Sequence, residues 1–244
     1  MKRALIVGGA NGIGLSIAKQ LAERKSCQKV YIVDRVRPSE CFMDDKFECF
    51  EFDLTETDFS FFDRFTDIDT LMITAGFGRL AHFHDLDENY IINSFNVNTT
   101  AAIRLIHRFY KYICSSADFY CGVMGSIAGF MSSPLFSVYG ASKAALKIFI
   151  ESVNVELLKA GTSNRILNVS PGSIKGTTFY NGTNDLSLTT GLASEIIHHL
   201  EAKDDLFIPL YEEVFQEVLQ RYHKDFRAEG IHSYEYKMES GRIK

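Results

Sequence analysis

The chain has 244 residues, of which 46% are hydrophobic and 23% charged, and it carries a formal net charge of −5 at pH 7. This composition is typical of a folded globular protein and argues against a disordered, fibrous or membrane-dominated chain. The sequence has no basic run that would mark a nucleic-acid surface and no apolar run near the roughly 20 residues that span a bilayer. A glycine loop is reached by Gly8, which leaves no room for a secretory signal, so we expect a cytoplasmic protein.

The five cysteines are odd in number, widely spaced and without a Cys-x-x-Cys pair. Neither a disulfide framework nor a zinc site is indicated by this pattern. His82 and His84 alternate in a loop, but no third ligand lies near them in the sequence. We therefore expect reduced thiols and no metal cofactor.

The predicted elements alternate between strands and helices in chain order. Strands are predicted at 3–7, 29–34, 47–52, 70–74, 118–124, 165–169 and 206–210. Helices are predicted at 12–24, near 58–65, from about 86 to 113, at 137–159, near 192–202 and near 212–222. This order predicts an α/β protein with a doubly wound parallel sheet of seven strands, covered by helices in three layers (α/β/α).

The sequence has no linker and no internal repeat, so residues 1–244 are predicted to form a single domain. Pro171-Gly172 ends a strand and opens a loop at about 173–190. In this loop, Phe179, Tyr180, Leu186 and Leu188 imply a partly apolar substrate pocket. The tail at about 222–244 is predicted to cover this pocket or to reach another subunit.

Gly8, Gly12 and Gly14 lie between the first strand and the first helix. Glycines at such a turn let the backbone bend tightly and approach a pyrophosphate at the helix N-terminus. A glycine cluster alone can be a simple turn, but its position directly after the first strand favours dinucleotide binding.

Asp34 ends the second strand, about twenty residues beyond the glycine loop. A carboxylate at this place can accept hydrogen bonds from the adenosine ribose hydroxyls, which favours NAD. Arg35 keeps NADP open, because an arginine there can hold a 2′-phosphate. The alternative for Asp34 is a cap on the following turn.

Tyr139 and Lys143 are four residues apart in a helical stretch, so their side chains share one face. A tyrosine is a poor base at neutral pH, and a nearby ammonium lowers its pKa by stabilising the phenolate. Most pairs with this spacing are solvated and have no catalytic role. Here Ser126 follows a buried strand and can bind a substrate oxygen, and Asn98 on the preceding helix can help to place a water.

A series of short segments supports a wider resemblance: Gly8–Gly14, Asp53-Leu54, Thr74-Ala75-Gly76, Asn96-Val97-Asn98, Gly125-Ser126, Tyr139–Lys143 and Asn168–Gly172. In this order and spacing, the sequence resembles the short-chain dehydrogenase/reductase family in its compact form over most of the chain. The resemblance implies a Rossmann fold and an NAD(P)-dependent oxidoreductase that interconverts an alcohol and a carbonyl.

The resemblance also implies roles for single residues. Tyr139 is the general acid/base, Lys143 lowers its pKa and holds the nicotinamide ribose, Ser126 orients the substrate oxygen and Asn98 supports a proton-relay water. Cofactor contacts are implied at Gly8, Asn11, Gly12, Ile13, Gly14, Asp34, Arg35, Asp53, Leu54, Ala75, Gly76, Tyr139, Lys143, Pro171, Gly172 and Ile174.

Three departures from the family pattern concern single residues. Val7 stands where a threonine usually precedes the first glycine, which affects stability more than chemistry. Thr74 replaces an asparagine that normally ties neighbouring strands together, which affects stability more than chemistry. Gly176 stands where a threonine normally contacts the carboxamide, so that contact is either displaced to Thr177 or lost.

Two other functions stay open beside the oxidoreductase. One is a dinucleotide-binding sensor or scaffold without turnover, and the other is a lyase or epimerase that uses bound NAD. The helices at 91–113 and 139–158 resemble those that form dimer and tetramer interfaces in the family, so we expect a homodimer or homotetramer. The remaining expected partner is a small-molecule alcohol or carbonyl substrate, without nucleic acid or a membrane.

Overall fold

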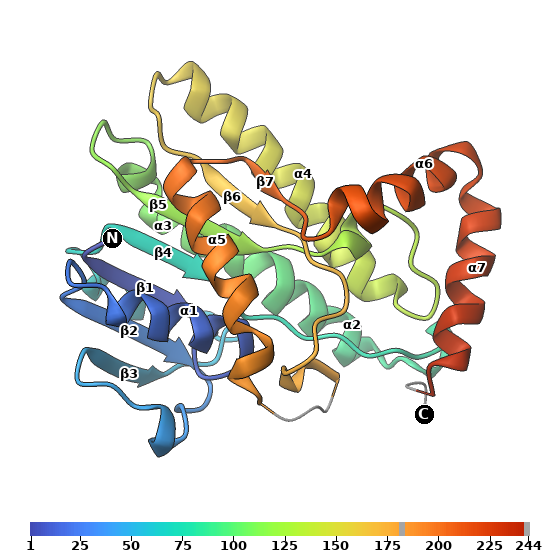
Figure 1. Ribbon diagram of the computed structural model, residues 1–244, viewed down its shortest axis with the longest axis horizontal. Coiled ribbons are helices and arrows are strands. Elements are labelled where there is room, and N and C mark those ends of the chain that lie inside the picture. Colours follow the sequence, from blue (N-terminus) through green and yellow to red (C-terminus); the bar gives the residue numbers. More distant parts are fainter. Residues whose placement is uncertain (181–183, 242–244) are drawn as a thin grey trace.

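The computed structural model describes residues 1–180 and 184–241, so 181–183 of the predicted loop and 242–244 of the predicted tail lie outside the described residues. Within them, seven strands form one parallel sheet in the order β3-β2-β1-β4-β5-β6-β7 (Figure 1). The strands are β1 (Arg3–Val7), β2 (Lys29–Asp34), β3 (Phe47–Glu51), β4 (Thr70–Ile73), β5 (Tyr120–Met124), β6 (Ile166–Val169) and β7 (Leu206–Phe207). The predicted doubly wound parallel sheet is confirmed.

Helices cover both faces of this sheet. The helices are α1 (Gly12–Glu23), α2 (Glu88–Phe95), α3 (Ala101–Ile113), α4 (Ser137–Lys159), α5 (Thr190–Ala202), α6 (Gln216–Lys224) and α7 (Phe226–Glu239). In Figure 1, α1 and α5 lie on one face, and α3 and α4 lie on the other. The pair α6 and α7 lies apart, beyond the ends to which the strands point.

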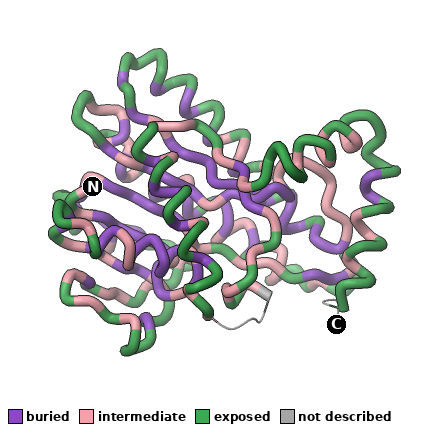
Figure 2. Tube along the Cα trace, viewed as in Figure 1, coloured by how far each residue is buried: buried purple, intermediate pink, exposed green. Residues whose placement is uncertain are grey.

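Alternation along β1 shows why both faces are buried. Leu5 and Val7 pack in a hydrophobic cluster with α3 and α4, whereas Ala4 and Ile6 pack in a second cluster with α1 and α5. Successive side chains of a strand point to opposite faces, so a strand buried on both sides is a continuous apolar run. Figure 2 shows the resulting buried centre.

Several elements differ from the prediction. Residues 58–65 form only a 3₁₀ turn, Ser60–Arg64, although Phe59, Phe62 and Phe65 are buried in the first cluster. The helix predicted at 86–113 is interrupted by a π-turn, Asn96–Thr100, and the predicted tail contains the ordered helix α7. None of the helices among the described residues is both long and apolar enough to cross a membrane.

Candidate active site

The glycine loop between β1 and α1 is fixed by close backbone approaches. Gly8 has φ +90°, and a Cβ there would lie 2.3 Å from the backbone nitrogen of Ala75. A Cβ on Gly14 would lie 2.4 Å from the carbonyl oxygen of Gly8. Only glycine fits these positions, because a left-handed backbone and a contact below 3 Å both disfavour a side chain. The loop therefore places the N-terminus of α1 where an anionic group can bind, and there the N–H of Gly12 donates to Asn184 Oδ1 at 2.8 Å.

Thr74 makes a contact between neighbouring strands, as the asparagine of the family pattern does. Its Oγ1 donates at 2.8 Å to the carbonyl oxygen of Gly8 and lies 3.2 Å from that of Val7. Because Thr74 follows β4 and Val7 ends β1, the hydroxyl joins these neighbouring strands at the edge that carries the glycine loop.

Asp34 lies at the carboxyl end of β2, beside the glycine loop. Its Oδ2 accepts a hydrogen bond from the backbone N–H of Ala10 at 3.0 Å, and its Oδ1 accepts one from the N–H of Arg35 at 2.8 Å. Burial raises the pKa of the Asp34 carboxyl, and these hydrogen bonds act in the opposite direction. Both interpretations of Asp34 from the sequence are therefore supported. Asp34 caps the following turn, and it also lines the cavity described below.

Tyr139 lies in the first turn of α4, with 7% of its surface exposed. The ring of Phe136 is stacked on it, with centroids 4.2 Å apart and planes 25° apart. Phe179 meets the same ring edge-on at 5.4 Å. The Tyr139 ring therefore packs in an aromatic cluster with two side chains that also line the cavity described below.

Lys143 lies one helical turn after Tyr139 and is 2% exposed. Its Nζ donates to the carbonyl oxygen of Met124 at 2.8 Å and lies 5.7 Å from the centroid of the Tyr139 ring. Burial lowers the pKa of Lys143 to about 7, because a charged ammonium loses its hydration there. The charge beside Tyr139 can thus change in the neutral pH range.

Ser126 follows β5 and begins a short 3₁₀ turn, Ile127–Gly129. Its Oγ accepts a hydrogen bond from the N–H of Ala128 at 3.2 Å. A hydroxyl that accepts one hydrogen bond keeps its proton available to donate, so Ser126 can donate to a substrate oxygen.

Asn98 lies in the π-turn and braces the loop after β4. Its Oδ1 accepts from the N–H of Phe77 at 2.9 Å, and its Nδ2 lies 2.9 Å from the carbonyl oxygen of Phe77 and 3.2 Å from Ser142 Oγ. Such π-turns are frequent at functional sites. Both donors of the amide are directed at protein atoms, so its water-relay role stays a prediction.

These elements meet at one cavity of about 1070 Å³, which lies above the usual range of about 300–1,000 Å³ for a small-molecule site. Ser126, Tyr139 and Lys143 line it, whereas Asn98 lies behind the wall. The residues predicted to contact the cofactor also line it: Gly8, Asn11, Gly12, Ile13, Gly14, Asp34, Arg35, Asp53, Leu54, Ala75, Gly76, Pro171, Gly172 and Ile174.

The other end of the cavity is formed by residues that, apart from Tyr236 in the predicted tail, were not predicted to line it. They come from the segment before α4, from the π-turn Tyr211–Phe215, and from α6 and α7. They include Met131, Ser133, Phe136, Val214, Phe215, Val218, Arg221, Glu229, His232, Tyr236 and Lys237. A Cβ on Gly172 would lie 2.6 Å from Phe215, so the C-terminal region also reaches the predicted nicotinamide contacts. The predicted cover by the tail thus has structural support.

The loop at 173–190 only partly matches its prediction. Phe179 lines the cavity, and so does Thr177, whose side chain also lies against Gly12. Leu186 packs instead in the cluster with α1 and α5, and Leu188 is 55% exposed, so the prediction that these two leucines form the pocket is wrong. Both lie in a 3₁₀ turn that leads away from the cavity into α5. The side chain of Tyr180 lies outside the described residues.

Known proteins resemble the chain in sequence. It is 28% identical over 169 residues to the dehydrogenase RED2 of Cochliobolus heterostrophus, across 66% of this chain and 63% of that protein. It is 31% identical over 104 residues to human 17-beta-hydroxysteroid dehydrogenase type 1, across 43% of this chain and 32% of that protein. The chain thus spans less than two thirds of the length of these curated relatives. A 3-oxoacyl-[acyl-carrier-protein] reductase, MabA of Mycobacterium avium, is 30% identical over 71% of this chain and 67% of its own length.

Solved structures share the fold at lower identity. A short-chain dehydrogenase from Burkholderia cenocepacia in complex with NADP has a TM-score of 0.76 and 22% identity, over 96% of this chain and 99% of that chain. A short-chain dehydrogenase/reductase from Burkholderia phymatum in complex with NAD has a TM-score of 0.79 and 16% identity, over 93% of this chain and 94% of that chain. The sequence model of the family described as short chain dehydrogenase matches residues 2–186. The chain therefore belongs to the short-chain dehydrogenase/reductase family.

Proposed function

We propose that this protein is a nicotinamide-dependent oxidoreductase that interconverts an alcohol and a carbonyl, with Tyr139 as the general acid/base. The observation that carries the proposal is that Ser126, Tyr139 and Lys143 line the same cavity as the glycine loop. The chemistry that a bound coenzyme supplies there is hydride transfer at nicotinamide C4. The chain's own residues have to orient the substrate oxygen and move one proton.

The coenzyme end fits a dinucleotide. At Gly8 and Gly14 a Cβ would fill space taken by neighbouring backbone, which keeps the loop close to the N-terminus of α1. Asp53 and Leu54 would lie beside adenine, and Ala75, Gly76, Pro171, Gly172 and Ile174 would line the path to the nicotinamide. We favour NAD, because the Asp34 carboxylate would accept from ribose hydroxyls and repel a 2′-phosphate. Arg35 beside it is the residue that would admit NADP.

In the reducing direction, the phenol of Tyr139 gives its proton to the carbonyl oxygen while the carbonyl carbon gains the hydride. The product is an alcohol, and the tyrosine is left as a phenolate. The Lys143 ammonium, 5.7 Å from the centroid of the Tyr139 ring, stabilises that anion. Ser126 donates to the same oxygen and holds it near Tyr139. Oxidation of the alcohol runs through the same steps in reverse.

The aromatic side chains around Tyr139 support one class of substrate. Phe136 and Phe179 contact Tyr139 on two sides, which favours a carbonyl carried by a flat apolar group. Human 17-beta-hydroxysteroid dehydrogenase type 1 is named for a substrate of that shape, and MabA for an acyl chain. We propose a cyclic or aromatic ketone, or the corresponding alcohol, as the substrate.

A substrate screen tests this function. The whole protein is incubated with cyclic, aromatic and acyl-chain ketones and alcohols, with NAD(H) or NADP(H), and turnover is followed at the nicotinamide absorbance. We expect turnover of flat cyclic compounds. Tight nucleotide binding without any turnover would instead support a sensor or scaffold, and product formed without added coenzyme would support a lyase or epimerase.

We further propose that the chain acts as one domain, in the cytoplasm, and as a homodimer or homotetramer built through α3 and α4. On α4, Ile148, Val155 and Leu158 are about 60% exposed. A row of exposed apolar side chains on a long helix is typical of an interface between subunits. Light scattering on the purified protein tests the assembly, and a monomer at micromolar concentration would contradict it.

A further inference from the structure

We propose that Lys237 on α7 is a positioning residue for the reaction. It holds the segment that precedes α4, so that Phe136 stays stacked on Tyr139 and the substrate space keeps its shape. The proposal rests on the proposed function in taking Tyr139 as the acid/base. It assigns a role to a helix that begins at Phe226, beyond the last of the family segments, Asn168–Gly172.

A polar clamp joins α7 to this segment. Lys237 Nζ donates to Ser133 Oγ at 2.7 Å and to the carbonyl oxygen of Pro134 at 2.9 Å. Hydrogen bonds from an ammonium are stronger than those between neutral groups. About two helical turns earlier, a Cβ on Gly230 would lie 3.5 Å from Ser132 Oγ, so α7 approaches the segment at a second place.

The clamped segment contains a strained residue. Leu135 is buried and has φ 63°, in the left-handed region that favours glycine. A non-glycine residue persists in this conformation only where its surroundings hold it. The carbonyl oxygen of Leu135 accepts from the N–H of Ala81 at 2.9 Å, which is one such restraint. The clamp on Pro134 is a second.

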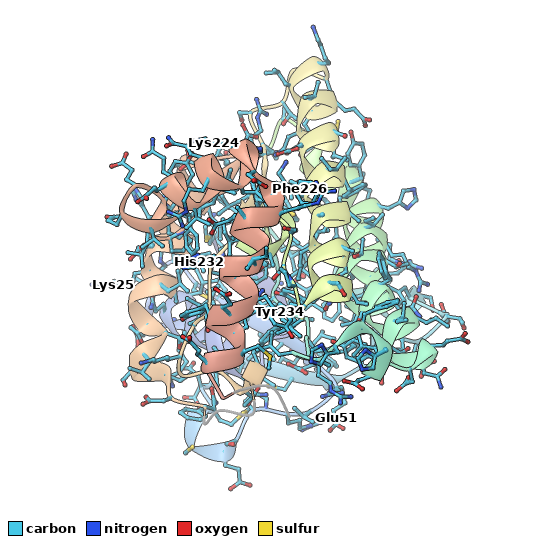
Figure 3. The ribbon with its side chains drawn as sticks, turned by 90° about the vertical axis from the view of Figure 1, so that its right-hand side faces the viewer. Lys25, Glu51, Lys224, Phe226, His232 and Tyr234 are labelled. Carbon is cyan, nitrogen blue, oxygen red and sulfur yellow. The ribbon has the colours of Figure 1, made fainter. Side chains whose placement is uncertain are left out.

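α7 also supports the Ala81 side of this contact. The ring of Tyr234 lies 6.2 Å from that of His82, the residue next to Ala81. Figure 3 looks onto α7 and shows Tyr234 on the side of the helix nearer to α2. Leu135 is thus held between two regions that both contact α7, one through Lys237 and one through Tyr234.

The strained residue directly precedes the ring that packs on the proposed acid/base. The N–H of Phe136 bonds to the carbonyl oxygen of Ser133 at 3.0 Å, and its ring lies 4.2 Å from that of Tyr139. A Cβ on Gly78 would lie 2.6 Å from the Phe136 ring, so this ring fills a defined place. If the segment relaxes, the ring moves and the substrate space changes.

α7 is itself well anchored at its other end. Arg221 of α6 donates to Glu229 through Nε at 2.7 Å, and Glu229 is only 8% exposed. The Asp225 side chain accepts from the N–H groups of Arg227 and Ala228 and caps the first turn. Lys237 therefore projects from a fixed helix, which makes it suited to restrain a loop.

The test compares three variants of the whole protein. Lys237→Met removes the clamp but keeps the length of the side chain, and Lys237→Arg keeps the charge and the donors. Lys224→Met, in the exposed last turn of α6, is the matched control. For the best ketone from the screen we expect Lys237→Met to lower kcat/KM by about 10- to 100-fold, because small misplacements of a reacting group cost this much. We expect Lys237→Arg to restore most of the loss and Lys224→Met to change nothing.

Two further measurements separate this proposal from the proposed function. The dissociation constant of the coenzyme should be unchanged in Lys237→Met, because the clamp lies at the substrate end. Hydrogen exchange should rise at the amides of Ala81 and Phe136 in Lys237→Met and stay unchanged in Lys224→Met. If the wild-type protein has no turnover, the proposed function fails and the exchange result alone decides on the clamp. Unchanged exchange, or kcat/KM within about threefold of wild type, overturns the proposal.

Discussion

The two ends of the cavity are built in different ways. The coenzyme end comes largely from the segments that follow β1 to β4, where backbone groups approach so closely that Gly8 and Gly14 have no room for a Cβ. The substrate end comes from segments far apart in the sequence, and its walls are side chains such as Phe136, Phe179 and Phe215.

This difference explains why the coenzyme end can be predicted from the sequence and the substrate end cannot. Where only glycine fits, the backbone geometry fixes the residue type, so the glycine in the sequence indicates that geometry. A contact such as that of Lys237 with Ser133 joins residues 104 positions apart, and many residue types can make such a contact. Substitutions at the coenzyme end should therefore have the larger and more specific effects.

The largest effect on stability is expected for Gly8→Ala. The new Cβ would meet the backbone of Ala75 at 2.3 Å, and the residue would also be strained at φ +90°. We expect the free energy of unfolding to fall by about 2–5 kcal/mol and coenzyme binding to be lost. Denaturant titration and coenzyme fluorescence measure the two effects.

Gly161→Ala is the matched control for this substitution. Gly161 has φ +80°, but nothing lies within 4 Å of a Cβ there. The Gly161→Ala variant isolates the effect of backbone strain, and we expect its free energy of unfolding to fall by about 1–2 kcal/mol. Equal losses in the two variants would show that the close approach to Ala75 contributes nothing.

The second effect concerns the charge of Lys143. Burial lowers the pKa of Lys143 to about 7 in the folded protein, whereas an unfolded chain keeps the proton to about pH 10.4. Between these values the unfolded state binds more protons, so this group makes stability rise with pH, by up to about 1.4 kcal/mol per unit. We expect Lys143→Met to lack this rise and to lose turnover.

Unfolding free energies of wild type and Lys143→Met at pH 7 and pH 9.5 measure this slope. Other groups contribute equally to both proteins, so their difference isolates Lys143. A difference that does not change with pH would show that Lys143 is charged in the folded protein over the whole range.

The third effect concerns the choice of coenzyme. Replacing the carboxylate in Asp34→Asn removes the repulsion of a 2′-phosphate, and we expect the ratio of the NAD and NADP dissociation constants to shift at least about tenfold toward NADP. Arg35→Ala is the companion variant. If it weakens NADP binding while NAD binding stays the same, Arg35 holds the 2′-phosphate; a wild-type preference for NADP would contradict our choice of NAD.

The smallest effect is expected at the substrate end, at Gly230 in α7. A Cβ there would meet its nearest atoms at 3.5 and 3.9 Å, which is ordinary contact. Alanine is favoured over glycine inside a helix, so Gly230→Ala should raise the free energy of unfolding by about 0.5–1 kcal/mol. A clear destabilisation would show that α7 and the segment at 132–134 pack more tightly than these distances indicate.

Much of the fold follows from local pattern. The buried run of β1, the glycine turn and the following helix α1 agree with one another in the sequence, and the structure confirms them. The predicted helix at 58–65 was wrong: the segment forms a 3₁₀ turn, and its phenylalanines are buried by packing against β2 and β3. Aromatic spacing alone does not separate these two structures.

The candidate site also has a part that could be predicted from the sequence and a part that could not. Ser126, Tyr139 and Lys143 carry functional groups whose chemistry is evident from residue type and spacing, and the structure brings them to one cavity. Tertiary packing produces the strained backbone of Leu135, the stacked ring of Phe136 and the clamp from Lys237. No local sequence pattern predicts these features. The prediction that Leu186 and Leu188 line the pocket failed, because the sequence of a loop does not show where its apolar side chains pack.

We propose that Tyr139 transfers the proton in a cavity that also binds the coenzyme. Tyr139→Phe removes only the hydroxyl and keeps the ring between Phe136 and Phe179. Turnover and the coenzyme dissociation constant are measured side by side in this variant and in wild type. We expect turnover to fall by about 10²–10⁴-fold or more and the dissociation constant to stay within about twofold. Turnover near the wild-type rate would contradict it.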